Sequence, residues 1–185
     1  MVPKARMGFL KESYSPIVSE DQGAQMFTID DELAGLIEGI VMIIIGTRDD
    51  NFRPAIGRSI GAALCNNGEA IDLFVPTVQW PETIDNAVLG APISVTFSRP
   101  TNYETIQIKG NVTKHESASF DEIEYAKSYL NRVRNVLVGL GVSRKQIEFL
   151  ATGPDLRRVQ FRPEQIFRQT PGPGAGARIA KHHNA

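Results

Sequence analysis

The chain has 185 residues, with 20 Lys and Arg against 21 Asp and Glu, so its formal net charge is −1. This length and a hydrophobic content of 42% predict one globular domain with a packed core. The near-neutral charge disfavours a nucleic-acid binder, because such proteins carry a basic surplus that neutralises phosphates. The single cysteine, Cys65, excludes an intramolecular disulfide and fits a reducing compartment, so we expect a cytoplasmic protein.

The chain shows no membrane signal and divides into three parts. Its longest apolar run, residues 40–45, is too short to span a bilayer, and residues 1–10 are too polar for a signal peptide. We therefore expect a soluble protein without a membrane partner. The expected parts are an irregular N-terminal arm (1–27), a folded domain (28–169) and a flexible C-terminal tail rich in Pro and Gly (170–185).

The first half of the domain predicts a short helix and three strands. The apolar spacing of residues 33–37 indicates a helix that Asp30 caps and Gly39 ends. Strands are expected at residues 40–47, 55–64 and 70–75. The first strand is a continuous β-branched run, which suggests that both of its faces are covered. Gly57 and Gly61 inside the second strand suggest a bend or the close approach of another group.

The second half predicts helices and strands in a different order. A brief helix starts at Pro81, and strands follow at residues 93–98 and 106–109. Capping boxes at Ser119 and Ser143 start a long amphipathic helix and a short one, before a last strand over residues 158–167. Six strands with helices before the first, after the third and after the fifth do not alternate as in a parallel α/β sheet. We expect a mainly β protein with peripheral helices, built on a six-stranded antiparallel barrel.

Several strings in this order resemble a known family. They are GTRD (46–49), RPAI (53–56), NAVLGAPISV (86–95), FSRPTNY (97–103), QIKG (107–110) and QTPGPGAG (169–176). Their order and spacing resemble the pyridoxamine 5′-phosphate oxidase-like family, whose fold is the FMN-binding split β-barrel. The resemblance covers nearly the whole chain, from Asp31 to Gly176.

The resemblance implies a homodimer with two FMN sites at the subunit interface and a small-molecule substrate. By position, the residues that it places at the cofactor are Arg58, Ser59, Ile60, Thr77, Gln107 and Lys109. Arg58, Ser59 and Thr77 could hold the phosphate, since a dianion attracts guanidinium and hydroxyl donors. Thr83 stands where relatives carry Lys or Arg, which weakens the expected grip on the phosphate.

The residues themselves leave alternatives open. Arg58 fits a phosphate ligand or an exposed barrel residue equally well, and Gln107 and Lys109 also fit outward positions of an alternating strand. Trp80 and Tyr103 are more typical of packing than of ring stacking. No metal site is expected, because the adjacent His182 and His183 lack ligand spacing.

Two functions from different classes compete. The leading hypothesis is an FMN-dependent oxidoreductase, in which the flavin carries the electrons and no protein acid or base is assigned. The alternative is a non-catalytic dimeric barrel that binds haem, another flavin-like cofactor or no cofactor.

Overall fold

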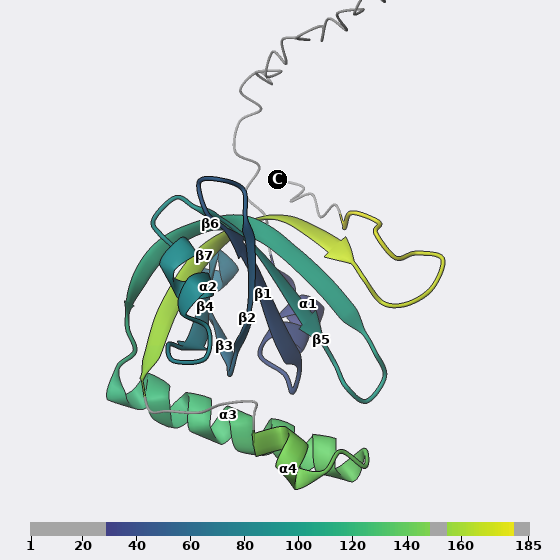
Figure 1. The fold of residues 1–185 in the computed structure, drawn as a ribbon. Coiled ribbons are helices and arrows are strands. Elements are labelled where there is room, and N and C mark those ends of the chain that lie inside the picture. The colour runs from purple at the N-terminus through teal and green to yellow at the C-terminus, as the bar shows by residue number, and fades with distance from the viewer. Residues whose placement is uncertain (1–28, 149–154, 180–185) are drawn as a thin grey trace, which may run out of the picture.

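The computed structural model describes residues 29–148 and 155–179. The helices are α1 (Asp31–Ile37), α2 (Pro81–Asn86), α3 (Phe120–Gly139), α4 (Arg144–Ile147) and the 3-10 turn η1 (Asn66–Gly68). The strands are β1 (Met42–Arg48), β2 (Pro54–Ser59), β3 (Ala62–Cys65), β4 (Ala70–Pro76), β5 (Pro92–Ser98), β6 (Thr105–Ser117) and β7 (Leu156–Arg168). The helices lie around the sheet, so the protein is mainly β with peripheral helices, as predicted (Figure 1).

The sheet closes on itself through a bent strand. Its order is β2-β1-β5-β6-β7-β4-β3, and neighbouring strands run antiparallel. Only Ile60 and Gly61 separate β2, which pairs with β1, from β3, which pairs with β4. At this bend the amide of Ile60 donates to the carbonyl of Phe74 at 2.9 Å. The seven strands therefore match the six predicted, because the strand expected at 55–64 is broken in the middle.

Two glycines in this bent strand have physical reasons to be glycine. Gly61 has φ +156, and a Cβ there would stand 3.1 Å from the Phe74 ring. At Gly57 a Cβ would stand 2.6 Å from the hydroxyl of Thr83 in α2. The two alternatives for this strand both occur, at different glycines: the chain bends at Gly61, and α2 approaches closely at Gly57.

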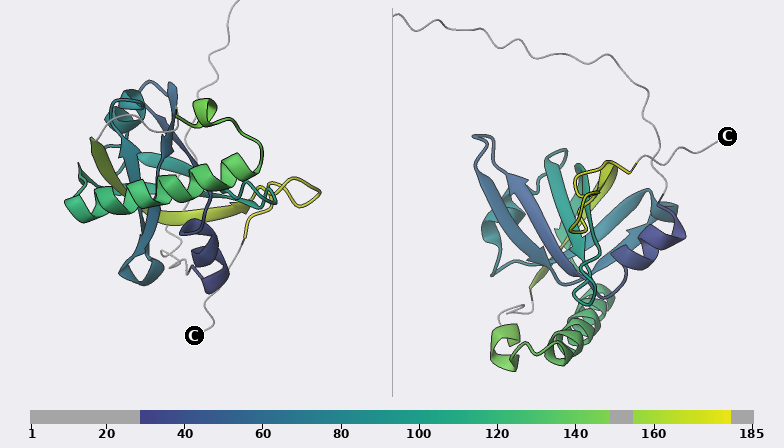
Figure 2. Two further views of the ribbon diagram at one scale, coloured as in Figure 1. Left: turned by 90° about the horizontal axis from the view of Figure 1, so that it is seen from below. Right: turned by 90° about the vertical axis from the view of Figure 1, so that its right-hand side faces the viewer.

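Helices α1, α2 and α3 all contribute side chains to the barrel core, and hydrogen bonds fix α1 and α3. In α1, the Asp30 side chain accepts a hydrogen bond from the amide of Leu33 at 3.0 Å, which confirms the predicted cap. Helix α3 crosses one end of the barrel (Figure 2) and starts at the predicted capping box of Ser119 and Glu122. The hydroxyl of Tyr129 on α3 accepts a hydrogen bond from the amide of Val41 at 3.3 Å and donates one to the Val41 carbonyl. This side chain ties α3 to the residue just before β1.

The expectation that β1 is covered on both faces is wrong. Ile43 and Ile45 are 2% and 1% exposed inside the barrel, whereas Ile44 between them is 37% exposed on the outer side. An antiparallel barrel wall has an inner and an outer face, and β-branched residues fit the pleat on either. A run of isoleucines therefore specifies a strand without specifying what covers it.

The end of the described chain folds back on β7. The amide of Ile179 donates to the carbonyl of Ile166 at 2.7 Å, and the amide of Arg168 donates to the carbonyl of Ala177 at 2.9 Å. Ile179 also packs against the barrel core. Part of the expected flexible tail is thus paired, whereas the expected arm at 1–27 and residues 180–185 lie outside the described residues.

Within 29–148 and 155–179, no helix combines the length and apolar character that crossing a bilayer requires.

Candidate functional site

Side chains from five strands form a row across the outer face of the sheet. Residues directly opposite each other in neighbouring strands project to the same face. Starting from Arg58 in β2, the pairing leads through β1, β5, β6 and β7 and ends at an isolated bridge to the folded-back tail. We call this set the outer row: Arg58, Ile44, Thr96, Gln107, Phe167 and Arg178.

The neighbouring row on the same face carries Lys109. Its members are Ile56, Gly46, Ser94, Lys109 and Gln165. Three of the predicted site residues, Arg58, Gln107 and Lys109, therefore share one face of the sheet. They do not converge, because Arg58 and Gln107 stand three strands apart, or about 14 Å at the usual strand spacing. Only an extended ligand or a second chain can contact them together.

This face exposes apolar side chains beside Arg58. Ile44, its neighbour in the outer row, is 37% exposed, and Ile56 on the same strand as Arg58 is 70% exposed. Large apolar side chains grouped on an outer face often mark a contact surface. Within the described residues, neither Arg58 nor Lys109 forms a salt bridge.

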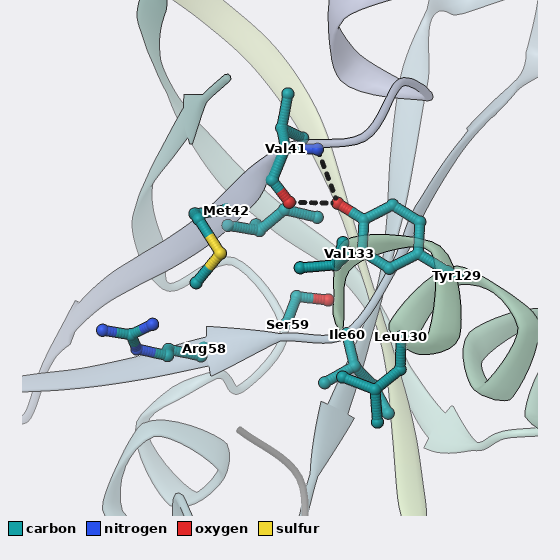
Figure 3. Close-up of a pocket in the computed structure, with 9 residues that line it drawn as sticks. Val41, Met42, Arg58, Ser59, Ile60, Tyr129, Leu130 and Val133 are labelled. Atoms are coloured by element: carbon teal, nitrogen blue, oxygen red, sulfur yellow. Dashed lines mark hydrogen bonds between the residues drawn. The ribbon is translucent and has the colours of Figure 1, made fainter. Parts of the chain in front are cut away.

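A small pocket opens where β1 and β2 meet α3. Met42, Arg58 and Ile60 line it from the strand side, and Tyr129, Leu130 and Val133 line it from the helix (Figure 3). Its volume of about 20 Å³ admits roughly one water molecule. A single protomer therefore does not enclose a flavin or a haem in this pocket.

The side chains of Ser59 and Ile60 are buried in the protomer, and their place at a cofactor stays a prediction. Ser59 is buried, and its hydroxyl lies 2.6 Å from the carbonyl oxygen of Gly61 and accepts a hydrogen bond from the amide of Phe74 at 2.9 Å. The bend that closes the barrel uses this hydroxyl. Ile60 is 8% exposed and packs with Phe74 and Leu130 beneath α3. Of the trio at 58–60, Arg58 has the accessible polar side chain.

Thr77 supplies a further candidate hydroxyl, at the end of β4. It follows β4 directly, and its amide donates to the carbonyl of Asp155 at 3.1 Å. The Thr77 hydroxyl is buried without a hydrogen-bond partner among the described residues. A buried hydroxyl normally has a partner, so this one can donate to a bound group or a water. The donor chemistry of Arg58 and Thr77 fits an anion.

Thr83 serves packing rather than anion binding. It is 2% exposed, and its side chain fills the space over Gly57. A Lys or Arg at this position cannot take the same place without displacing α2 from β2, because a longer side chain does not fit there. Thr83 therefore holds a packing position between α2 and β2.

The barrel wall built by β3, β4, β6 and β7 carries a different polar group. Gln160 donates to the Asp72 carboxylate at 2.9 Å and to the Cys65 sulfur at 3.3 Å. Burial, with a further contribution from Asp72, raises the pKa of the Cys65 thiol to about 11. This thiol stays protonated near neutral pH and is a poor nucleophile. In the part of the chain that the structure describes, no cluster of three or more His, Cys, Asp or Glu residues could hold a metal.

The aromatic candidates lie apart from the outer row. Trp80 packs against the barrel core, and Tyr103 is 69% exposed in the loop between β5 and β6. Phe167 and Arg178, which do belong to the row, were not recognised as site residues. One sequence feature could have indicated that the segment around Arg178 is ordered: the neighbouring Ile179 is an isolated apolar residue, and it packs against the barrel core.

Comparisons with known proteins give fold neighbours at low identity. No family model matches the chain, and no curated protein matches it. HupZ of Group A Streptococcus is 16% identical over 80% of this chain and 100% of its own, with a TM-score of 0.46. A pyridoxamine 5′-phosphate oxidase-related, FMN-binding protein from Nostoc punctiforme is 12% identical over 73% and 77%, with a TM-score of 0.42. HutZ, the haem storage protein of Vibrio cholerae, is 11% identical over 77% and 95%, with a TM-score of 0.42.

At these identities the likeness concerns the fold alone and assigns no cofactor to this chain. The fold of this chain is defined by its own strand order and by the bent strand that closes the sheet. On that topology the chain has the split β-barrel fold of the pyridoxamine 5′-phosphate oxidase-like proteins, as the sequence resemblance predicts.

Proposed function

We propose that this protein is a homodimeric FMN-dependent oxidoreductase that acts on a small molecule. The outer face carries this proposal, because it joins an uncovered apolar surface to cations that lack carboxylate partners among the described residues. A second copy laid on this face would cover Ile44 and Ile56 and enclose a cleft that one protomer lacks.

Residues of this chain fit the parts of FMN. Arg58 would attract the phosphate, and the Thr77 hydroxyl, which has no partner among the described residues, would donate to one of its oxygens. Gln107, half-buried on the same face, offers an amide that can both donate and accept at the edge of a flavin ring. FMN would supply the electron transfer itself, while the protein binds and orients it and excludes water.

The described residues favour FMN over haem on this face. Haem iron needs an axial ligand, which in proteins is His, Cys, Met or Tyr. The two rows of the outer face contain none of these residues between 29 and 148 or between 155 and 179. His115 lies apart from these rows, because it pairs with Val159 on the other wall. It is half-buried, and burial and the charge of Arg157 lower its pKa.

A titration with FMN tests this function. Flavin fluorescence should be quenched by the wild type, and Arg58→Ala should bind about tenfold to a hundredfold more weakly, because a charge-assisted hydrogen bond contributes roughly 1.5 to 3 kcal/mol. Arg144→Ala, an equally charged change on the exposed short helix α4, is the matched control and should bind like the wild type. Circular dichroism should show that both variants are folded.

The outcomes separate the competing functions. Equal affinity of Arg58→Ala and the wild type would remove Arg58 from the phosphate site. If the wild type does not bind FMN, the flavin proposal fails, and a haem titration followed by the Soret band tests the non-catalytic alternative. If FMN binds, reduction of the bound flavin by NADH or NADPH would show oxidoreductase chemistry.

A further inference from the structure

The end of the outer row opposite Arg58 carries an aromatic ring between two cations. Phe167 pairs with Gln107 on one side and with Arg178 of the folded-back tail on the other. The Lys109 ammonium lies 5.0 Å from the centre of the Phe167 ring. Phe167 at the centre of this arrangement stands four strands away from Arg58, about 19 Å along the sheet at the usual strand spacing.

The direction of the Arg178 side chain follows from the backbone. The two hydrogen bonds that flank the Phe167–Arg178 pair make it a non-hydrogen-bonded antiparallel pair, in which side chains are close and share a face. Ile179, the next residue, points inward and packs against the core. Alternation along the strand therefore sends Arg178 outward, to the side of Phe167.

The surroundings of Phe167 carry positive charge that is not balanced locally. Neither row of the outer face contains a carboxylate, and Lys109 and Arg178 have no salt bridge in the described part of the chain. The carboxylate of Glu104 is paired with Arg99, and that of Glu164 accepts from Asn111. Phe167 is only half-buried, so its ring can be reached from solvent.

We infer that Phe167, Lys109 and Arg178 form a binding subsite for a planar aromatic carboxylate. An aromatic ring stacks on Phe167 in an offset or edge-on arrangement, and its carboxylate lies between the ammonium and the guanidinium. The tail segment 177–179 is then part of the site, because it positions Arg178. That this ligand is the substrate rests on the proposed function, whereas its binding does not.

A pair of probes with the same ring system tests the subsite. We expect 2-naphthoate to bind more tightly than its neutral isostere 2-naphthamide, measured by calorimetry on the full chain. Lys109→Gln and Arg178→Gln should each weaken 2-naphthoate about threefold to fivefold, the size of an exposed ion pair, and leave 2-naphthamide unchanged. Phe167→Leu should weaken both probes, since stacking does not depend on the charge.

Matched controls and FMN define the outcomes. Lys145→Gln, on exposed α4, should bind both probes like the wild type. Equal affinity for the acid and the amide, or a loss at Lys145→Gln as large as at Lys109→Gln, would overturn the subsite. Complete competition between FMN and 2-naphthoate would also overturn it, because Phe167 would then belong to the flavin. Naphthoate binding by a protein that does not bind FMN would keep the subsite and refute the proposed function.

Discussion

The two outer walls of this barrel differ in how the chain itself covers them. Helix α3 packs on the wall at Phe74 and Ile60, and the Arg158 guanidinium beside it pairs with carboxylates. Among the residues that the structure describes, no helix packs on the outer face over β2, β1, β5 and β6, and Ile44 and Ile56 there are exposed. One wall is completed within the protomer, whereas the other has polar and apolar groups ready for a partner.

Arg158 shows how the covered wall is held together. Its guanidinium contacts the carboxylate of Glu122 at 2.7 Å, that of Glu116, and that of Asp72 at 4.0 Å. The network joins β7, β6, β4 and the start of α3. Arg58, also on a barrel strand, has no carboxylate partner among the described residues. We expect Arg158 to serve stability and Arg58 to serve binding, and the following variants separate these two roles.

The largest expected effect is on dimerisation, when a carboxylate is introduced into the uncovered face. Ile44→Glu is expected to convert the proposed homodimer to a monomer, since an unpaired charge buried in an apolar interface costs about 2 to 5 kcal/mol. Light scattering at micromolar concentration measures the change. Val138→Glu on α3 is the matched control, because Val138 is also 37% exposed. A wild-type monomer, or a dimer that tolerates Ile44→Glu, would show that this face is not the interface.

Breaking the covered wall should instead lower stability. Arg158→Met leaves Glu116, Glu122 and Asp72 without their shared cation, and we expect a loss of roughly 2 to 3 kcal/mol in the free energy of unfolding. Urea denaturation measures it. Arg157→Met, which removes only a 3.2 Å hydrogen bond to Ser117, should cost less. FMN affinity should not change in either variant, and a change would couple the two walls.

Local sequence signals predicted the elements and most of the architecture. The caps at Asp30, Ser119 and Ser143 are all present, because the oxygen of a capping side chain reaches only the amides of the next turn. Periodicity also located the strands, since alternation depends on neighbours in sequence. It failed for Ile44, because the run 40–45 is equally apolar whether or not a partner covers it.

The candidate site was less accessible to sequence reasoning. Arg58, Gln107 and Lys109 were identified by their position in a resemblance, and the cross-strand pairing places them on one face. The role of the Ser59 hydroxyl at the bend near Gly61 was not predicted, because a serine beside an arginine has no local signal for which face it takes. Arg178 was missed because its position depends on a return of the chain to β7, which is a tertiary contact.

A smaller loss of stability is expected where Tyr129 of α3 contacts Val41, just before β1. The Tyr129 hydroxyl bonds both the amide and the carbonyl of Val41, beside the pocket that includes Arg58. Tyr129→Phe should lower the free energy of unfolding by about 1 to 2 kcal/mol, because it leaves buried backbone groups unpaired. Tyr103→Phe, at an exposed loop, should change nothing. An equal loss in both variants would contradict a specific role of the Tyr129 hydroxyl.

The smallest expected effect is a dependence of stability on pH at the covered wall. Burial opposes ionisation of Glu122, but hydrogen bonds from Ser119 and the charge of Arg158 outweigh it and lower the pKa of this carboxyl. A carboxylate with a lowered pKa in the folded state stabilises the protein above its unfolded pKa, and this contribution disappears as the pH falls through the folded pKa. The free energy of unfolding of the wild type should therefore decrease below about pH 4.5, more steeply than that of Glu122→Gln, with a difference at neutral pH of about 1 kcal/mol.

Thermal melts between pH 3 and 7 measure this dependence. Glu124→Gln is the control and should keep the wild-type slope, because Glu124 pairs with Lys127 on the exposed side of α3. Parallel pH profiles for the wild type and Glu122→Gln would mean that Arg158 acts mainly through its other two carboxylates, Asp72 and Glu116.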